Sequence, residues 1–391
     1  MRILFLHEVG YLEKPIFEMH EFPEQLAARG HEVAFADYPE TKKHKTTSRF
    51  GGVIQGRVLR GTRIRLYSQK AMFPGIFGRL LAVFIFPFFF YRVLRDFRPE
   101  IVVSFAVPTS GWQAAIICKV HGKPLVFRAL DVSHKIRKSL FASLIKASER
   151  LVYSSSSWVS CNNPALLEYC ISLGAKKDKS SVEYPPLDLS HFVEGASKKS
   201  TRRKLGISID SQVILYMGSF FYFSGLDDVL KNLALMSERP ALVLIGGGEQ
   251  GPELRALSKN LQLEDCVKFT GFVEFEDLPS YLSIADVAIN PMVPTLVSHK
   301  ALPNKVLQYM ASGLPVVTSK LDGLSSIFPA EVGVQSVSKS SEVLAAAVGM
   351  LEISDLERLG EANRAAVASK FDVHNTVRRF EQMLLTLAAD S

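Results

Sequence analysis

Cysteine is scarce in this chain. The 391 residues include four cysteines, Cys118, Cys161, Cys170 and Cys266, whose spacing matches no metal-binding pattern. So few scattered thiols argue against a disulfide-stapled secreted scaffold. They fit a protein of a reducing compartment, in which each thiol acts as a small buried apolar group.

Acidic residues are absent from one long interval, between Glu40 and Asp96. The rest of the chain has 34 basic and 39 acidic residues, so it carries a charge of −5 although the whole chain carries +7. The basic excess is therefore local and needs a local explanation. The interval holds twelve basic residues: Lys42, Lys43, Lys45, Arg49, Arg57, Arg60, Arg63, Arg65, Lys70, Arg79, Arg92 and Arg95.

Apolar runs long enough for a membrane span are also missing. The run Leu80–Tyr91 has 12 residues and contains Pro87, whereas a transmembrane helix needs about 20. Met1 and Arg2 are followed by ILFLH, which is too short for the apolar core of a secretory signal. We expect that segment to form a buried strand.

Aromatic residues crowd the end of the basic interval. Basic charge beside an aromatic, apolar helix suits an anionic bilayer, because charge attracts the protein to headgroups and buried rings add apolar transfer energy. The alternative is a buried core helix after a solvated basic loop. Nucleic acid is not an expected partner, because no binding motif accompanies the charge. We predict a membrane-contact segment at about residues 42–95, with these aromatics: Phe73, Phe77, Phe84, Phe86, Phe88, Phe89, Phe90 and Tyr91.

The first half of the chain predicts a parallel α/β domain. Strand, helix and strand at 2–6, 18–29 and 32–36 form a βαβ unit. The loop with His7 and Gly10 then lies at the carboxyl edge of the sheet, where α/β proteins bind ligands. His7 faces a ligand there or serves as a strand-end hydrogen-bonding residue.

More strands extend this sheet, at 100–105, 124–127 and 157–161, and a long helix is expected at about 136–154. The strand that ends at Phe127 delivers Arg128, Asp131 and His134 to the same sheet edge.

The βα rhythm starts again after a polar, basic boundary at 197–204. Glycine-containing loops at 218–225 and 246–248 follow the first two strands. Two consecutive parallel α/β domains leave a cleft between their strand ends, where two substrates can meet. The expected strands are 213–217, 241–245, 267–269, 287–290 and 316–317.

The stretch Leu302–Val317 predicts a short helix that begins at Pro303–Asn304 and ends at Gly313. Lys305 and Gln308 share one face of this helix, and the N–H groups of its first turn can receive an anion. A solvated polar stripe on a packed helix explains the spacing equally well.

Several motifs, in this order and at these intervals, carry a family resemblance. The sequence resembles the retaining GT-B glycosyltransferases of glycosyltransferase family 4 over essentially its whole length. The motifs are Tyr216-Met-Gly-Ser-Phe with Ser224-Gly-Leu-Asp, Leu244-Ile-Gly-Gly-Gly-Glu249, Val267-Lys-Phe-Thr-Gly-Phe-Val273, Leu278-Pro-Ser-Tyr-Leu, Ala285-Asp-Val-Ala-Ile-Asn-Pro291 and Pro303 to Val317.

The resemblance implies an α/β fold of GT-B type, in which two Rossmann-like domains face a cleft. It implies an acceptor-binding domain at 1–194, a nucleotide-sugar-binding domain at 195–372 and a C-terminal helix at 373–391 that crosses back. The activity implied is sugar transfer from a nucleotide sugar with retention, without metal or other cofactor, because protein groups neutralise the leaving diphosphate.

The chain departs from the family pattern at the donor site. Ser219 and Ser224 stand where many members have basic residues, and Lys300 and Gln308 stand at the positions of two glutamates. Glutamine still hydrogen-bonds a ribose, though more weakly than a carboxylate. We expect Lys300 or Lys305 to supply the positive charge that the two serines lack.

The resemblance assigns the remaining site residues. Asp131, Lys300 and Lys305 are the predicted catalytic residues, and no residue is assigned to a metal. The acceptor side has His7, Gly10, Arg128 and His134. The donor side has Gly218, Ser219, Ser224, Gly225, Gly247, Glu249, Val273, Ala301, Leu302, Asn304 and Gln308.

The expected partners are a UDP- or GDP-linked sugar, a glycan or lipid-linked acceptor, and an anionic membrane surface. The expected location is the cytoplasm, peripheral at the inner face of the cell membrane. One alternative is a catalytically impaired relative that binds a nucleotide sugar, because the usual charged pair is missing. The other is a sugar-nucleotide epimerase, against which the motif at 303–317 argues.

Overall fold

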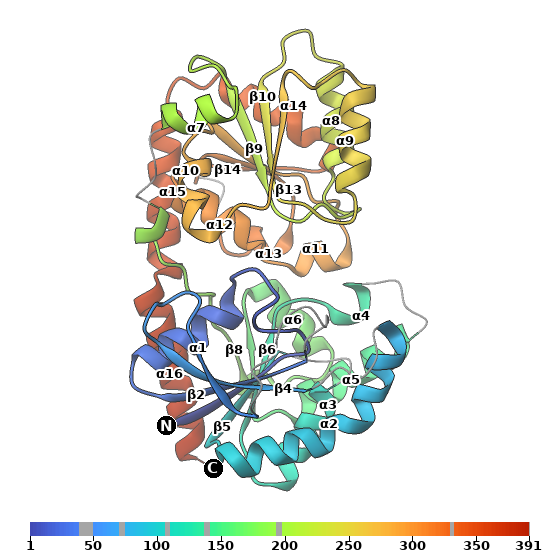
Figure 1. Cartoon of the computed structure of the whole chain (residues 1–391), viewed down its shortest axis with the longest axis vertical. Helices are drawn as coiled ribbons and strands as arrows, with labels where there is room; N and C mark the ends of the chain where they lie inside the picture. Colours follow the sequence, from blue (N-terminus) through green and yellow to red (C-terminus); the bar gives the residue numbers. More distant parts are fainter. Residues whose placement is uncertain are drawn as a thin grey trace. The chain divides into compact units, whose positions relative to one another are not determined.

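The chain forms two compact units in the computed structural model (Figure 1), which describes residues 1–38, 50–69, 75–105, 110–136, 141–192, 198–328 and 332–390. Unit 1 comprises Met1–Pro186 and His374–Ser391, and unit 2 comprises Leu187–Val373. The sequence places the corresponding boundaries after residues 194 and 372. No helix of the described residues combines the length and apolarity needed to cross a membrane.

Unit 1 is built on a sheet whose described strands run in the order β3-β4-β2-β1-β5-β6-β7-β8. All neighbours are parallel except β3 and β4, an antiparallel pair at one edge. Strands β1, β2, β5, β6 and β7 are mostly buried and read as apolar runs, which is why the sequence predicts them, whereas β3, β4 and β8 were not predicted. The strands are β1 (Arg2–Leu6), β2 (Glu32–Asp37), β3 (Gly52–Gln55), β4 (Arg63–Ser68), β5 (Ile101–Ser104), β6 (Leu125–Ala129), β7 (Trp158–Cys161) and β8 (Ser180–Val182).

The first and last helices of unit 1 pack together. The rings of Phe22 in α1 (Glu18–Ala28) and Phe380 in α16 (Val373–Ala389) lie 4.2 Å apart. Glu381 accepts a hydrogen bond from Arg29 Nε at 2.8 Å and contacts His31. These contacts attach the C-terminal helix to the first domain.

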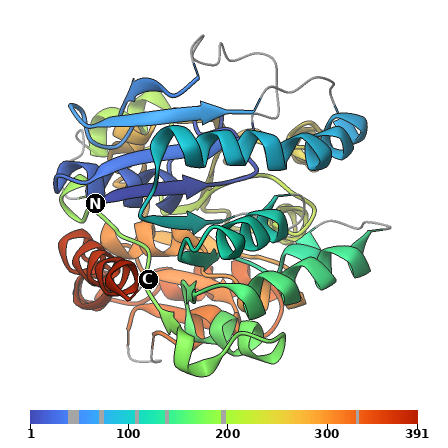
Figure 2. The ribbon, with the colours of Figure 1, turned by 90° about the horizontal axis from the view of Figure 1, so that it is seen from below.

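A second group of helices lies side by side in unit 1: α2 (Gly75–Phe97), α3 (Gly111–Val120) and α5 (Ala142–Ser155). Helix α3 packs against both α2 and α5 (Figure 2). Phe86 and Phe90 of α2 share one apolar core with Ala114 of α3 and with β1. The other helices of this unit are α4 (Ser133–Ile136), α6 (Pro164–Ser172) and the short η1 (Lys177–Lys179).

Unit 2 is built on a parallel sheet whose described strands run in the order β11-β10-β9-β12-β13-β14. The strand order reverses between β9 and β12. Open α/β sheets bind ligands at such a reversal, outside the carboxyl ends of the strands. The strands are β9 (Val213–Met217), β10 (Ala241–Ile245), β11 (Val267–Gly271), β12 (Val287–Asn290), β13 (Val316–Ser319) and β14 (Val334–Val337).

The helices of unit 2 bury their apolar faces against this sheet and against one another, with Leu230 of α8 and Leu344 of α14 in one core. They are α7 (Lys198–Lys204), α8 (Leu226–Ala234), α9 (Gly251–Asn260), α10 (Leu278–Leu282), α11 (Leu296–Lys300), α12 (Asn304–Ala311), α13 (Asp322–Ser325), α14 (Val343–Leu351) and α15 (Leu356–Phe371), with the short η2 (Ser190–Phe192), η3 (Phe275–Asp277) and η4 (Ser340–Glu342).

The structure adds elements that the sequence did not predict. The basic interval contains β3 and β4, and in β4 the arginines Arg63 and Arg65 are exposed while Ile64 and Leu66 are buried. Part of the interval thus belongs to the sheet edge. Strand β14 was also missed, and the predicted helix 136–154 corresponds to α5 preceded by the separate α4. Lys42, Lys43, Lys45, Arg49 and Lys70 lie outside the described residues.

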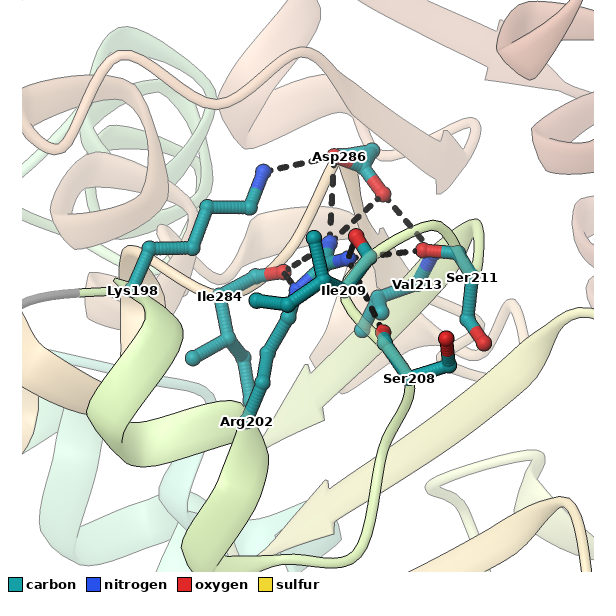
Figure 3. A network of polar contacts seen from close by, with 8 residues as sticks. All are labelled: Lys198, Arg202, Ser208, Ile209, Ser211, Val213, Ile284 and Asp286. Carbon is teal, nitrogen blue, oxygen red and sulfur yellow. Dashed lines mark hydrogen bonds and ion pairs between the residues drawn. The ribbon is translucent and has the colours of Figure 1, made fainter.

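The polar boundary at 197–204 contains a helix, α7, that is anchored by a buried arginine (Figure 3). Arg202 is 1% exposed, and its guanidinium donates to the carbonyl oxygens of Ile284 at 2.7 Å and Ile209 at 2.6 Å. It also pairs with Asp286 at 3.1 Å. Sequence composition indicated only a polar, basic boundary here, because composition does not reveal which charge the fold buries.

Candidate functional site

The candidate donor site lies at the carboxyl ends of β9, β10 and β12, where the strand order of unit 2 reverses. Its loops pack so closely that only glycine fits. A Cβ on Gly246 would lie 2.1 Å from the carbonyl oxygen of Gly218, and one on Gly225 would lie 1.9 Å from that of Pro291. All three glycines have positive φ, between 72° and 143°. The glycines of the two loops therefore bring three strand ends together.

Lys305, in the first turn of α12, reaches this point. Its Nζ lies 3.0 Å from the hydroxyl of Tyr216 and 4.2 Å from the centre of the Tyr216 ring. A Cβ on Gly218 would lie 3.1 Å from the same Nζ. No carboxylate pairs with Lys305 in the described part of the chain, and burial lowers its pKa to about 7.

Helix α12 is held in place by a second contact with β9. The backbone N–H of Met217 donates to the Tyr309 hydroxyl at 2.6 Å, and that hydroxyl lies 3.3 Å from the Met217 carbonyl oxygen. Tyr309 is fully buried. The roles of Tyr216 and Tyr309 were not predicted from the sequence. The two tyrosines are 93 residues apart, and no local signal shows that one contacts Lys305 while the other holds α12 against β9.

Lys300 stands at the end of α11, in a different charge environment. Its Nζ lies 3.7 Å from Asp322 Oδ2, and His299 Nδ1 lies 3.3 Å from Asp322 Oδ1. Its side chain is 20% exposed. The two predicted cations therefore differ: Lys300 has a carboxylate partner, whereas Lys305 faces a tyrosine.

The two serines of the first loop differ in exposure. Ser219 is exposed. Ser224 is 2% exposed, and its hydroxyl has no hydrogen-bond partner among the described residues. A hydroxyl can hydrogen-bond a phosphate but brings no formal positive charge. Among the site residues predicted in unit 2, Lys300 and Lys305 are the ones that can supply such a charge.

The remaining predicted donor residues lie on loops and on α12. Glu249 is exposed after the glycine turn that contains Gly247, and Val273 is partly buried after β11. Gln308 is partly buried in α12, where its backbone carbonyl oxygen accepts a hydrogen bond from Ser312 Oγ at 3.0 Å. Ala301 and Leu302 precede α12, and Asn304 is its first residue; Leu302 is 5% exposed.

The acceptor-side residues of unit 1 lie at the carboxyl edge of its own sheet. His7 stacks on Phe105 at 5.6 Å, and its Nδ1 accepts from the N–H of Glu8 at 2.8 Å. Burial lowers the pKa of His7 to about 3, so the ring is neutral at pH 7. Gly10 contacts Glu13, whose Oε2 would lie 2.9 Å from an added Cβ.

Arg128 is fully buried inside unit 1. It donates to Glu18 Oε2 at 2.7 Å through Nε, and to Ser160 Oγ at 2.9 Å and the Glu183 carbonyl oxygen at 2.6 Å through Nη1. Its guanidinium also lies over the ring of Phe22. The fold therefore uses Arg128 as an internal cross-link and does not present it to solvent.

Asp131 and His134 belong to a cluster that the sequence predicted only in part. His134 Nδ1 lies 2.7 Å from Glu149 Oε2, and the Tyr169 hydroxyl donates to the same oxygen at 3.0 Å. Asp131 accepts from Ser133 Oγ at 3.3 Å. Burial raises the pKa of Asp131 to about 6, which suits a carboxylate that exchanges a proton near neutral pH.

A small cavity of about 20 Å³ lies at the same edge of the unit 1 sheet. Polar and apolar residues from β1, β2, α2 and the loops beside them line it. Burial raises the pKa of Asp37 to about 6, although it accepts from the N–H of Tyr11. The lining residues are Leu6, His7, Glu8, Asp37, Tyr38, Gln69, Ala82, Phe86, Phe89 and Ser110.

The sequence matches two family models. The model described as Glycosyltransferase Family 4 matches residues 19–191, and the one described as Glycosyl transferases group 1 matches residues 211–352. The first range lies almost entirely in unit 1 and the second lies in unit 2. Together they cover most of the chain.

Curated relatives carry related names. The chain is 28% identical over 185 residues to an uncharacterised glycosyltransferase of Methanocaldococcus jannaschii, and the match spans about half of that relative's length, 46% of each chain. It is 23% identical over 304 residues to TuaC of Bacillus subtilis, a putative teichuronic acid biosynthesis glycosyltransferase, with 76% of this chain and 73% of the relative covered. It is 26% identical over 322 residues to LpsD of Rhizobium meliloti, a lipopolysaccharide core biosynthesis glycosyltransferase, with 80% and 83% covered.

Solved structures resemble the whole chain. Anabaena HepE in complex with UDP has a TM-score of 0.75 at 17% identity, covering 99% of this chain and 100% of that one. Sucrose-phosphate synthase from Thermosynechococcus elongatus has a TM-score of 0.81 at 20% identity, covering 100% of both chains. At such identities the likeness shows the fold, and it confirms the predicted GT-B architecture of two parallel-sheet α/β domains.

Proposed function

Because the chain belongs to the group 1 and family 4 glycosyltransferases, we propose that it transfers a sugar from a nucleotide sugar to a glycan or lipid-linked acceptor. The anomeric configuration is retained, and no metal ion is needed. The donor binds to unit 2 and the acceptor to unit 1. A UDP-linked donor is favoured, because the related HepE structures contain UDP and UDP-glucose.

The position of Lys305 carries this proposal. Its ammonium stands beside Gly218, at the strand-order reversal where α/β sheets bind ligands, with no carboxylate partner among the described residues. The leaving diphosphate gains negative charge as the bond to the sugar breaks. A preorganised cation in a partly desolvated site stabilises that charge. Lys300 supplies a second positive charge, and Gln308 hydrogen-bonds the donor ribose.

The acceptor chemistry rests on unit 1 and on the relatives. Asp131 receives or positions the acceptor hydroxyl, since a carboxylate with a pKa of about 6 is ionised at neutral pH and still accepts a proton. The names of TuaC and LpsD refer to cell-surface glycans. A surface-glycan precursor on a lipid carrier, handled at the cytoplasmic face of the cell membrane, is therefore the proposed acceptor.

A nucleotide-sugar panel tests the proposal. Thermal unfolding is measured with UDP, GDP, ADP and their sugars, because a ligand that binds the folded state raises Tm. The nucleotide sugar that stabilises the protein is then assayed for transfer to lipid-linked acceptors, and the anomeric configuration of the product is read by NMR. Inversion would contradict the retaining mechanism, and the absence of any stabilising nucleotide would contradict the function.

One alternative has a specific observation behind it. Ser219, Ser224 and Gln308 replace charged residues of the family pattern, which suits a nucleotide-sugar-binding homologue with impaired catalysis. Binding without transfer or hydrolysis in the same panel would favour that alternative. Conversion of the donor to its epimer without an acceptor would instead identify a sugar-nucleotide epimerase.

A further inference from the structure

Three neighbouring helices of unit 1 expose large apolar side chains. Phe84 and Phe88 of α2 are 73% and 79% exposed, Val120 of α3 is 76% exposed, and Leu144 of α5 is 67% exposed. Single exposed apolar residues are normal on a soluble protein, but a set gathered on adjacent elements marks an interaction surface. The set consists of Phe84, Phe88, Tyr91, Ile116, Val120, Phe141, Leu144 and Leu151, the last three on α5 or directly before it.

The residues of each helix lie on one stripe. Phe84, Phe88 and Tyr91 are four and three residues apart, and Ile116 and Val120 are four apart, so each group lies on one side of its helix. Helix α3 packs between α2 and α5 (Figure 2). The rings of Tyr91 and His121 lie 5.5 Å apart, which joins the stripes of α2 and α3. The three stripes thus belong to one surface, here called the α2–α3–α5 face.

Positive charge surrounds these apolar groups. Arg92 and Arg95 of α2, Lys119 of α3 and Arg150 of α5 are exposed. Among the described side chains of the three helices, the one exposed acidic residue is Asp96, and the Tyr67 hydroxyl donates to it at 2.6 Å. The α2–α3–α5 face therefore combines large apolar groups with a net positive charge.

We propose that the α2–α3–α5 face docks on the surface of an anionic lipid bilayer. Its phenylalanines, Val120 and Leu144 insert between headgroups, while the arginines and lysines contact lipid phosphates. This inference deepens the membrane location included in the proposed function, since five of the eight apolar side chains lie on α3, on α5 or directly before α5, outside the predicted segment at 42–95. It rests on the proposed function in one respect: a lipid-linked acceptor requires the enzyme to work at a membrane.

A bilayer explains the surface better than a second copy of this chain. In a symmetric dimer the same patch of both copies meets, so two surfaces of net positive charge would come together. Like charges at close range oppose such a contact. A lipid surface instead supplies negative charge around an apolar interior, which is the complement of this face.

Vesicle flotation of the full chain tests the proposal. The vesicles contain phosphatidylcholine with or without phosphatidylglycerol. The double variant Val120→Ser, Leu144→Ser removes apolar groups from α3 and α5 without touching α2. The matched control is Leu235→Ser, because Leu235 is 85% exposed and belongs to unit 2, whereas the face belongs to unit 1. Circular dichroism and Tm confirm that each variant folds.

The wild type and the control are expected to float with anionic vesicles at low salt, and flotation falls at high salt because charge attraction is screened. The double variant is expected to bind vesicles about tenfold more weakly, since each lost apolar side chain removes transfer energy. Equal flotation of the double variant and the wild type would show that α3 and α5 take no part in the membrane contact, which contradicts the proposal. No flotation of the wild type would overturn the proposal entirely.

Two further measurements separate other outcomes. Stabilisation by the nucleotide sugar is measured on the same variants and is expected to be unchanged, so failure of membrane docking and failure of the proposed function are distinguishable. Light scattering reports the oligomeric state. A wild-type dimer that the double variant converts to a monomer would show that this face binds protein, which contradicts a bilayer.

Discussion

Replacement of Lys305 by methionine removes one charge from the candidate donor site and keeps a chain of similar length. The Lys305 ammonium lies 3.0 Å from the Tyr216 hydroxyl and beside Gly218, which has no side chain. A hydrogen bond to a charged partner contributes about 2 kcal/mol, which corresponds to about a thirtyfold change in Kd. We expect Lys305→Met to weaken nucleotide-sugar binding by about that factor.

The pH dependence of binding gives a sharper test. Burial lowers the pKa of Lys305 to about 7, so about nine-tenths of the free protein carries this charge at pH 6 and about one-tenth at pH 8. A bound diphosphate favours the protonated form, so binding takes up a proton above pH 7. The Kd of the wild type should therefore rise about tenfold from pH 6 to pH 8, or about 1.4 kcal/mol.

Isothermal titration calorimetry measures both effects. The ligand is the intact nucleotide sugar, because the terminal phosphate of a free nucleotide itself titrates near pH 6. The control is Lys231→Met, since the Lys231 side chain is 55% exposed and pairs with Asp227 on α8. If Lys305→Met binds as tightly as the wild type, or keeps the same pH dependence, Lys305 does not hold the diphosphate.

Four further outcomes follow from the contacts described. Arg202→Met leaves several buried carbonyl oxygens and Asp286 without a partner, so urea denaturation should show a loss of about 3 kcal/mol. Gly225→Ala places a Cβ against the Pro291 carbonyl oxygen at a residue with positive φ, so it should lower Tm and abolish donor binding. Gly206→Ala is the control, because Gly206 has a similar φ but open space around it, and donor binding should remain intact. Asp131→Asn should reduce turnover while the donor Kd stays unchanged. Because the pKa of Asp131 is raised to about 6, its carboxylate is mostly charged only above that pH, so wild-type turnover should fall as the pH drops through 6. EDTA should leave turnover unchanged if protein cations neutralise the diphosphate, and a loss restored by added Mg²⁺ would contradict this.

Local patterns predicted most of the regular structure. The strands that were predicted, such as β1, β6, β9 and β10, are short, mostly apolar runs, and such runs mark parallel strands buried on both faces. The pair β3–β4 was missed because it lies at a sheet edge, where Arg63 and Arg65 alternate with buried residues and the basic composition dominates. Edge strands of this kind resemble solvated loops in sequence.

The sequence motifs predicted which residues belong to the candidate site. They did not predict which side chains those residues contact in the folded chain. Nothing local to Lys305 indicates that Tyr216 lies beneath its ammonium, 89 residues away. Arg128 illustrates the same limit: its place after a buried strand favoured an acceptor contact, whereas the fold surrounds it with Glu18, Ser160 and Glu183. The identity of the residue does not reveal whether a charge is buried with a partner or left for a ligand.

The sequence by itself determined the fold class, the repeated βα order and the stretch Leu302–Val317 as the family signature, because each depends on residues near one another in the chain. Tertiary structure decided the charge state and surroundings of that stretch. It placed Lys305 beside a tyrosine and a glycine and paired Lys300 with Asp322, and it brought the apolar stripes of α2, α3 and α5 onto one surface. Burial, pKa and surface continuity arise from contacts between distant segments, so they are properties of the folded chain alone.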